Sequence, residues 1–439
     1  MDKLSRKKQL LFGVTLFSMF FGAGNLIFPP YLGYQAGREA LPAFLGFAVS
    51  AVGLPILGVI AVVRNNGLHS LAGRVSKPFA AIYTMLIYLS IGPCLAIPRT
   101  ASTSFEMAVT PFLPDRSWTF WLQILYSAVF FSIALALTLH PTQLVNLLGK
   151  HLAPLLLILI AVLTLGGIFY GFSGMNAPSG NYASVPAVQG FLDGYQTMDA
   201  IAALIFGMVF TLNISNYGVT DKLSVYHTTV HAGWIAAALF VAVYGSLTWV
   251  GAAGAAGSKV ENGAQVLSYV AMRLFGQGGE IILAAIFFIA CLNTCISLIC
   301  CCGEYFHKLI PKLSYPAWAS VFAVFSAVVA NTGLNAILKF SIPVLDGLYP
   351  MAIVLIGLAF LPKDFHTSRP LLYPLSIALT GIVSVTASLH SAGLDIPFLT
   401  KAVNQLPLAS FGLEWLFPAL VGIATGMFVV RKNAVSAAA

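Results

Sequence analysis

The sequence predicts an all-α polytopic membrane protein with about 12 transmembrane helices. First, only 8% of the 439 residues are charged and 59% are hydrophobic, whereas soluble domains carry roughly 25% charged residues. Second, apolar runs of membrane-spanning length, which takes roughly 20 residues, recur along the chain. Third, the basic residues collect on one side of the predicted topology. Together these observations exclude a soluble globular fold.

The apolar runs, taken in order, define the predicted spans. They are placed at residues 9–36, 41–62, 78–108, 119–139, 147–172, 191–217, 229–256, 279–305, 316–332, 338–361, 372–390 and 413–430. An even number of spans puts both termini on the same side. Of the 22 basic residues, 15 then fall on the side of the termini. The positive-inside rule makes that side cytoplasmic.

The charge distribution and the motifs that are absent exclude several classes of function. Because the basic residues lie in short loops, the net charge of +8 reports topology and does not indicate nucleic-acid binding. No linker exceeds about twenty residues, so a cytosolic catalytic or signalling domain has no place in the chain. The chain also has no phosphate-binding loop, HExxH motif or paired zinc motif. We therefore expect neither an enzyme nor a resident cofactor.

The first span carries poor helix formers at its centre. Residues 20–30 read FFGAGNLIFPP, so that Gly22, Gly24 and Asn25 free the backbone to unwind. An unwound segment at membrane depth is tolerated only where protein or a water-filled cavity satisfies its backbone groups. The pattern therefore predicts a discontinuous helix whose freed amides and carbonyls face a ligand. Two alternatives stay open: close helix packing through the glycines, or a kink at Pro29 and Pro30.

The sixth span repeats this feature. Residues 190–200 read GFLDGYQTMDA and again place glycine and polar residues in a membrane-length run. The two interrupted spans are offset by five, an odd number, so the halves insert with opposite orientations. We therefore expect inverted repeats at 9–172 and 190–361, two additional helices at 372–430, and a substrate site between the repeats.

Three stretches resemble a known family. They read FGAGNLIFPP at 21–30, GPCLAIPRTA at 92–101 and GYQTMDAIAA at 194–203. They are similar to the branched-chain amino acid:cation symporters, the bacterial leucine/isoleucine/valine carriers. The resemblance covers nearly the whole chain. It implies one transporter domain over 1–439, a leucine-transporter-like 5+5 inverted repeat with discontinuous first and sixth helices, and two C-terminal helices. It also implies multi-pass insertion in the bacterial cytoplasmic membrane.

The resemblance implies that the substrate lies between the two breaks. The candidate substrate-binding residues are Gly22, Ala23, Gly24, Asn25, Met198, Asp199, Ala202 and Phe206. Met198, Ala202 and Phe206 recur along one helix face, although ordinary bundle packing also explains Met198 and Phe206. For Asp199 we favour a structural or gating role over direct binding of the amine, and a proton-carrying role is also open.

The resemblance also implies a sodium site between the first break and the eighth span. Its candidate ligands are Gly22, Asn25, Asn293, Thr294 and Ser297. Such a cation prefers hard oxygen ligands. The family more often has two threonines where Asn293 and Thr294 stand, so the ligand set of this chain differs. The alternative is that the hydroxyl groups bond back to their own helix.

Charged residues inside predicted spans are the remaining candidates, because charge in lipid is costly. Arg99 and Glu106 fall on one helix face in the third span, and Asp346 lies in the tenth. We assign all three a gating or structural role. An extracellular-half gate formed by Asp346 and Lys339, seven positions apart, is one interpretation; the simpler one is an interfacial Lys339 whose side chain reaches water.

The resemblance implies a secondary symporter that imports leucine, isoleucine and valine with sodium by alternating access. The alternatives are a proton-coupled amino acid transporter and a transporter-like amino acid sensor. We expect small-molecule substrates and membrane lipid as partners, and no nucleic acid. The sequence leaves the oligomeric state, the stoichiometry and the preference among the three substrates open.

Overall fold

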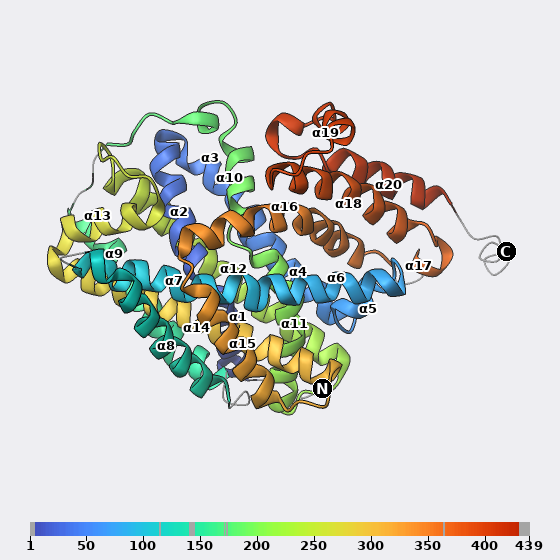
Figure 1. Cartoon of the computed structure of the whole chain (residues 1–439), viewed down its shortest axis with the longest axis horizontal. Helices are drawn as coiled ribbons and strands as arrows, with labels where there is room; N and C mark the ends of the chain where they lie inside the picture. The colour runs from blue at the N-terminus through green and yellow to red at the C-terminus, as the bar shows by residue number, and fades with distance from the viewer. Residues whose placement is uncertain are drawn as a thin grey trace.

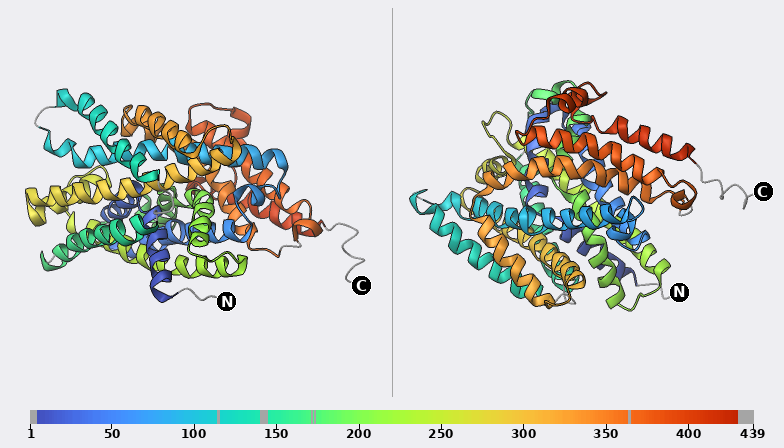
Figure 2. Two further views of the ribbon diagram at one scale, coloured as in Figure 1. Left: turned by 90° about the horizontal axis from the view of Figure 1, so that it is seen from below. Right: turned by 45° about the vertical axis from the view of Figure 1, so that its right-hand side comes forward.

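A computed structural model describes residues 5–113, 116–139, 145–170, 172, 174–362 and 365–429. Every element in this part of the chain is a helix, and the helices pack side by side into one bundle (Figures 1 and 2). Nine helical segments of the described residues are long and apolar enough to cross a membrane, and two apolar helices, α15 (Tyr315–Ala330) and α20 (Leu416–Phe428), are shorter. The predicted all-α polytopic class is therefore confirmed.

The helices match the predicted spans in order. The last predicted span, 413–430, ends one position beyond the described residues. The other main helices are α3 (Ala40–Ala48), α4 (Leu54–Arg64), α5 (Leu68–Ala72), α6 (Lys77–Leu89), α7 (Ala96–Ala108), α8 (Thr119–Thr138), α9 (Ala153–Tyr170), α12 (Lys222–Trp249), α13 (Gly263–Phe275), α14 (Gln277–Leu309), α16 (Leu334–Ala359) and α18 (Leu372–Ser391).

The first span is broken where its glycines predict. Helix α1 (Arg6–Phe20) ends before Phe21, whose backbone is extended, and α2 (Ala23–Ala36) begins after Gly22. The backbone N–H of Gly22 donates to the side-chain oxygen of Asn25 over 2.9 Å, which caps the start of α2. Pro29 and Pro30 lie inside α2, which continues through them. The glycines and Asn25, and not the prolines, therefore set the break.

The sixth span is broken as well. Helix α10 (Pro186–Tyr195) ends in a turn, and α11 begins at Asp199 and runs to Asn216. Between them Met198 adopts left-handed backbone angles, with φ 69° and ψ 4°. For a residue with a side chain this conformation costs on the order of 1–2 kcal/mol. Such a conformation persists only where the surrounding packing holds it, and it is common at ligand sites.

Two glycines let α10 lie directly against α3. A Cβ added to Gly190 would lie 1.9 Å from the carbonyl oxygen of Ala43, and one added to Gly46 would lie 1.9 Å from that of Ala187. Each helix thus presents a glycine to the backbone of the other, as small residues do in membrane helix pairs. The first half of the broken sixth span is therefore fixed to the second span.

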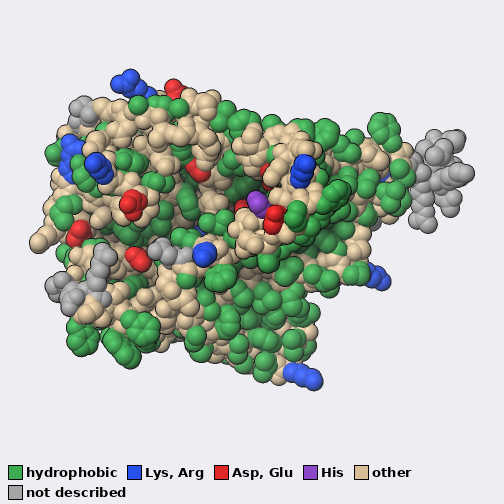
Figure 3. All heavy atoms as spheres, turned by 45° about the horizontal axis from the view of Figure 1, so that its top comes forward, with side chains coloured by type: hydrophobic (Ala, Val, Ile, Leu, Met, Phe, Trp, Pro, Cys, Tyr) green, Lys and Arg blue, Asp and Glu red, His purple; other side chains and the backbone are tan. Residues whose placement is uncertain are grey.

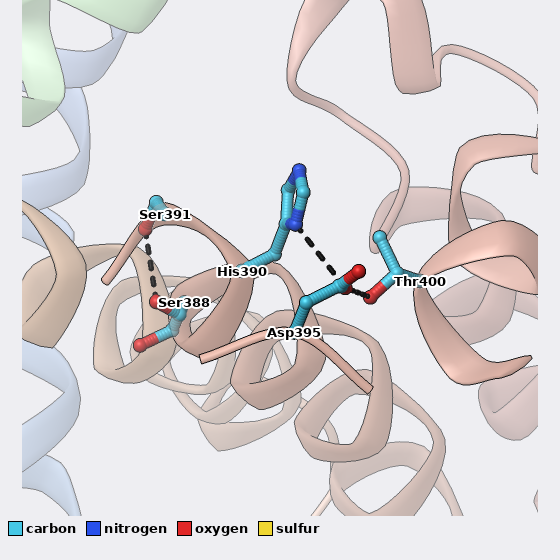
Figure 4. Close-up of polar contacts among 5 residues, drawn as sticks. All are labelled: Ser388, His390, Ser391, Asp395 and Thr400. Atoms are coloured by element: carbon cyan, nitrogen blue, oxygen red, sulfur yellow. Dashed lines mark hydrogen bonds and ion pairs between the residues drawn. The ribbon is translucent and has the colours of Figure 1, made fainter. Parts of the chain in front are cut away.

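The C-terminal helix α18 lies between α16 and α20 at one side of the bundle (Figure 1). Ser388 of α18 donates a hydrogen bond of 2.6 Å to the carbonyl oxygen of Pro343 in α16. The loop that leads from α18 to α19 (Pro397–Asn404) is held by Asp395, which contacts His390 over 3.3 Å and accepts from Thr400 over 2.6 Å (Figure 4).

Large apolar side chains are exposed on the outside of the bundle. Examples are Trp234, Phe340 and Phe169, with exposed fractions of 74%, 71% and 87%. In the space-filling view hydrophobic side chains cover broad areas, and the charged groups are few and scattered (Figure 3). Such an exterior suits a lipid environment, where apolar side chains meet acyl chains and not water.

Candidate functional site

The two helix breaks meet at a small enclosed cavity in the middle of the bundle. Its lining includes all eight of the predicted substrate-binding residues, of which Gly22 and Asn25 are also predicted cation ligands, together with a third predicted cation ligand, Thr294. The residues around it are Phe20, Gly22, Ala23, Gly24, Asn25, Ile91, Ala96, Arg99, Thr100, Thr197, Met198, Asp199, Ala202, Phe206, Thr294 and Leu298. Segments far apart in the sequence thus converge on one site through α1, α2, α7, α11 and α14.

The cavity has a volume of about 30 Å³. One water molecule needs a cavity of at least roughly 10–15 Å³, so this space suits only one or a few waters. An amino acid with a branched side chain does not fit without movement of the lining residues. The site is therefore closed around the two breaks. Entry of an amino acid requires the surrounding helices to shift.

Asn25 joins the two breaks. Its side-chain nitrogen donates a hydrogen bond of 2.5 Å to the carboxylate of Asp199 and a second, short one to the hydroxyl of Tyr244 in α12. The Tyr244 hydroxyl lies 3.3 Å from the same Asp199 oxygen. All three side chains are at least 97% buried. Because a buried carboxylate is unfavourable unless it is hydrogen-bonded, this network stabilises Asp199 at the start of α11.

Arg99 also reaches the cavity, from the third span. Helix α7 begins at Ala96, after the backbone leaves helical geometry at Gly92. The Arg99 side chain is 7% exposed, and its Nη1 lies 3.5 Å from the carbonyl oxygen of Gln196 in the second break. A Cβ added to Gly24 would lie 2.9 Å from Arg99 Nη2. The guanidinium therefore lies against both breaks.

The other predicted intramembrane charges lie elsewhere. Glu106 is exposed on α7 and does not line the cavity. Asp346 is half-buried in α16 and does not line the cavity. Lys339 is exposed, as an interfacial side chain would be. Among the predicted gating charges, only Arg99 reaches the site.

Oxygen atoms gather between the end of α1 and α14. The Thr294 hydroxyl lies 3.5 Å from the carbonyl oxygen of Phe20, and a Cβ on Gly22 would lie 2.5 Å from that hydroxyl. The carbonyls in the last turn of a helix lack partners within it. Asn293 is fully buried; its amide nitrogen donates to Ser18 over 2.9 Å, while its oxygen has no hydrogen-bond partner in the described part of the chain. This oxygen set suits a hard cation.

Two predicted cation ligands have other partners. The Ser297 hydroxyl donates to the carbonyl of Asn293 over 2.9 Å, which is the back-bonded alternative for this residue. The Asn25 side-chain oxygen accepts from the backbone of Gly22, and its nitrogen faces Asp199. Of the other three predicted ligands, Thr294 lies against Phe20 and Gly22, and Asn293 contacts Ser18 of α1.

The sequence did not single out several residues of the site. Tyr244 lies in an apolar span where nothing distinguishes it from a packing aromatic. Ala96 and Thr100 lie in the stretch at 92–101 that resembles the family, and this resemblance is the sequence feature that could have indicated them. Thr197 lies in the predicted second break, and its hydroxyl donates to the carbonyl of Gly194 over 2.8 Å. Their place in the site depends on how distant helices approach one another.

Comparison with known families gives a match along the chain. The family model described as "Branched-chain amino acid transport protein" matches residues 5–433. The branched-chain amino acid permease BraB of Bacillus subtilis is 39% identical over 426 residues, which cover 96% of this chain and 95% of that protein. The branched-chain amino acid transport system 2 carrier protein of Pseudomonas aeruginosa is 39% identical over 417 residues, 94% of each.

Solved structures show the same fold at low sequence identity. MhsT in complex with L-phenylalanine superposes with a TM-score of 0.57 at 16% identity, covering 97% of this chain and 99% of that one. Mhp1, a nucleobase-cation-symport-1 family transporter, gives a TM-score of 0.56 at 12% identity, covering 95% and 91%. A manganese transporter of Eremococcus coleocola gives 0.59 at 14%, covering 97% of each. The predicted leucine-transporter-like fold is thereby confirmed.

Proposed function

Because the chain belongs to the branched-chain amino acid transport protein family, we propose that it imports leucine, isoleucine and valine together with sodium. It is a carrier and not an enzyme. It works in the bacterial cytoplasmic membrane with both termini in the cytoplasm. The observation that carries the proposal is the meeting of two helix breaks at one enclosed, mostly apolar cavity.

The cavity supplies partners for each part of an amino acid. The first turns of α2 and α11 present backbone N–H groups, which favour a carboxylate. The ends of α1 and α10 present carbonyls, which favour an ammonium group. Phe20, Ile91, Ala202, Phe206 and Leu298 supply apolar surface for an aliphatic side chain. When the lining moves apart, the enlarged cavity therefore suits a small apolar zwitterion.

The coupling ion has a matching set of oxygens beside this cavity. We assign sodium to the carbonyl of Phe20, the hydroxyl of Thr294 and the side-chain oxygen of Asn293. The supporting observation is the buried Asn293 oxygen, because a buried acceptor without a partner is costly and a cation satisfies it. Since Phe20 and Thr294 also border the substrate cavity, binding of the ion at the end of α1 steadies the break that holds the substrate.

Alternating access follows from how the broken helices are attached. Asn25, Asp199 and Tyr244 tie the first, sixth and seventh spans together, and the Gly190–Gly46 crossing ties the sixth to the second. We infer that these four spans rock as a unit against the remaining helices. The repeats at 9–172 and 190–361 supply the two related halves of this motion, with 372–430 outside them.

The test is uptake of radiolabelled leucine into proteoliposomes that contain the purified full chain. We expect uptake to require an inward sodium gradient and to stop when choline replaces sodium at fixed pH. Uptake that is unchanged in choline rejects sodium coupling. A buried carboxylate, Asp199, favours proton coupling as the second candidate, and uptake driven by an inward proton gradient without sodium would establish it.

A further inference from the structure

Arg99 is a buried cation with few partners. Its side chain is 7% exposed, and its hydrogen bond to the Gln196 carbonyl is long, at 3.5 Å. Within the described part of the chain, the guanidinium forms no ion pair. A guanidinium carries five N–H donors, so most of its hydrogen-bonding capacity is unused here. A charge buried in this state is costly unless a partner reaches it.

The position of Arg99 shows where that partner would come from. Its Nη2 lies beside Gly24 in the first turn of α2, and the side chain lines the cavity together with Asp199. The fixed fork of a guanidinium matches the two oxygens of a carboxylate. Asp199 places one fixed negative charge in the same cavity, held by Asn25 and Tyr244. The cavity thus presents one charge of each sign, as a zwitterion does.

We propose that Arg99 binds the carboxylate of the transported amino acid directly and makes the carrier select zwitterions over amines that lack a carboxylate. The inference rests on the proposed function and adds the residue that recognises the carboxylate. In this assignment the backbone amides at the helix breaks position the carboxylate, and Arg99 supplies its counter-charge. A purely structural Arg99 would brace α7 against the Gln196 carbonyl and balance the charge of Asp199 in the same cavity.

The two roles differ in their response to ligand chemistry. Leucinol keeps the side chain and amine of leucine but replaces the carboxylate with a neutral CH₂OH group. The affinities of both compounds are measured by calorimetry on the purified full chain in sodium. We expect the wild-type chain to prefer leucine over leucinol by roughly 10- to 100-fold, the range expected for hydrogen bonds to a charged group.

Three variants separate the roles. In Arg99→Gln, the affinity for leucine should fall roughly 10- to 100-fold while the affinity for leucinol changes little, so that the preference for leucine disappears. Arg99→Lys should keep a smaller preference, because a point charge lacks the fork. The control is Arg273→Gln, since Arg273 also donates to a backbone carbonyl, that of Gly254 at 3.3 Å, but does not line this cavity. It should leave the preference at the wild-type value.

The outcomes distinguish this inference from the proposed function. If wild-type protein binds no leucine, the proposed function fails. If it binds leucine and Arg99→Gln keeps the wild-type preference over leucinol, the carboxylate role of Arg99 is overturned while the proposed function stands. Should Arg99→Gln not fold, as judged by its melting temperature, Arg99→Lys decides: a preference reduced severalfold supports the role, and an unchanged preference rejects it.

Discussion

The side-chain nitrogen of Asn25 donates a hydrogen bond of 2.5 Å to the carboxylate of Asp199, and this bond joins two helix breaks that lie 174 positions apart in the chain. Asn25 also accepts from the backbone of Gly22 with its oxygen. One amide therefore both starts α2 and holds the carboxylate at the start of α11. Asn25 is therefore a direct link between the two breaks.

Replacing Asn25 with alanine should abolish leucine uptake and lower the free energy of unfolding by about 2–6 kcal/mol. The Gly22 amide loses its cap and the buried Asp199 carboxylate loses a donor, and each such loss costs roughly 1–3 kcal/mol. Denaturation in detergent and proteoliposome uptake measure the two effects. The matched control is Asn181→Ala. The Asn181 side chain also donates a hydrogen bond, to the Gln189 side-chain oxygen over 3.0 Å, but on the exposed surface. Equal effects of the two variants would contradict the role of Asn25.

Gly24→Ala should strongly reduce uptake. The added Cβ would lie 2.9 Å from Arg99 Nη2 and 3.3 Å from Thr197 Cα, so the two breaks must move apart to accept it. Gly357→Ala is the control, because an added Cβ on this exposed helical glycine has no atom within 4 Å. It should leave uptake intact and raise stability by up to about 1 kcal/mol. Normal uptake by Gly24→Ala would show that the breaks do not close on the substrate at this point.

Thr294→Val should raise the sodium concentration needed for half-maximal uptake roughly tenfold. The substitution removes one oxygen ligand, whose loss costs about 1.4 kcal/mol of sodium binding, and keeps the side-chain volume nearly constant. Thr164→Val removes a hydroxyl that likewise donates to a backbone carbonyl, that of Ile160 at 3.0 Å, but is not at the cation site. It should leave the sodium dependence unchanged. A sodium requirement that stays the same in Thr294→Val would remove Thr294 from the ligand set.

Isoleucine and valine should compete with leucine uptake, whereas lysine and glutamate should not. Arg99 and Asp199 are the charged side chains of the cavity, and both are matched by the zwitterionic ends of the substrate. A charged substrate side chain would meet apolar groups such as Phe206 and Leu298 and lose its hydration without a partner. Inhibition by lysine or glutamate as strong as by isoleucine would contradict this assignment of the pocket.

Much of the architecture is predictable because it rests on local properties. Apolar run length places the spans, and the bilayer thickness gives that length a physical meaning. Gly22, Gly24 and Asn25 indicate a break because they weaken the helix in a place where lipid cannot satisfy the backbone. The same argument finds the second break near Met198 and Asp199. These features need no knowledge of which helices are neighbours.

The sequence does not predict the partner of each polar side chain. The sequence places Arg99 and Glu106 on one face of α7, yet one is buried at the cavity and the other is exposed. The sequence alone likewise does not show that Ser297 bonds back to Asn293 while Thr294 faces Phe20. Helical periodicity defines a direction from the axis but not the depth of a residue or the helix that it meets.

From the sequence alone follow the membrane class, the order of the apolar segments, the two interruptions and the family resemblance, because each depends on the composition of a short contiguous stretch. Only the tertiary structure decided that Asn25 meets Asp199 and Tyr244, that Arg99 faces Gly24, and that an unpaired Asn293 oxygen lies near the end of α1. These contacts join residues on separate helices, and the packing of whole helices, not local composition, determines which atoms come within hydrogen-bonding distance.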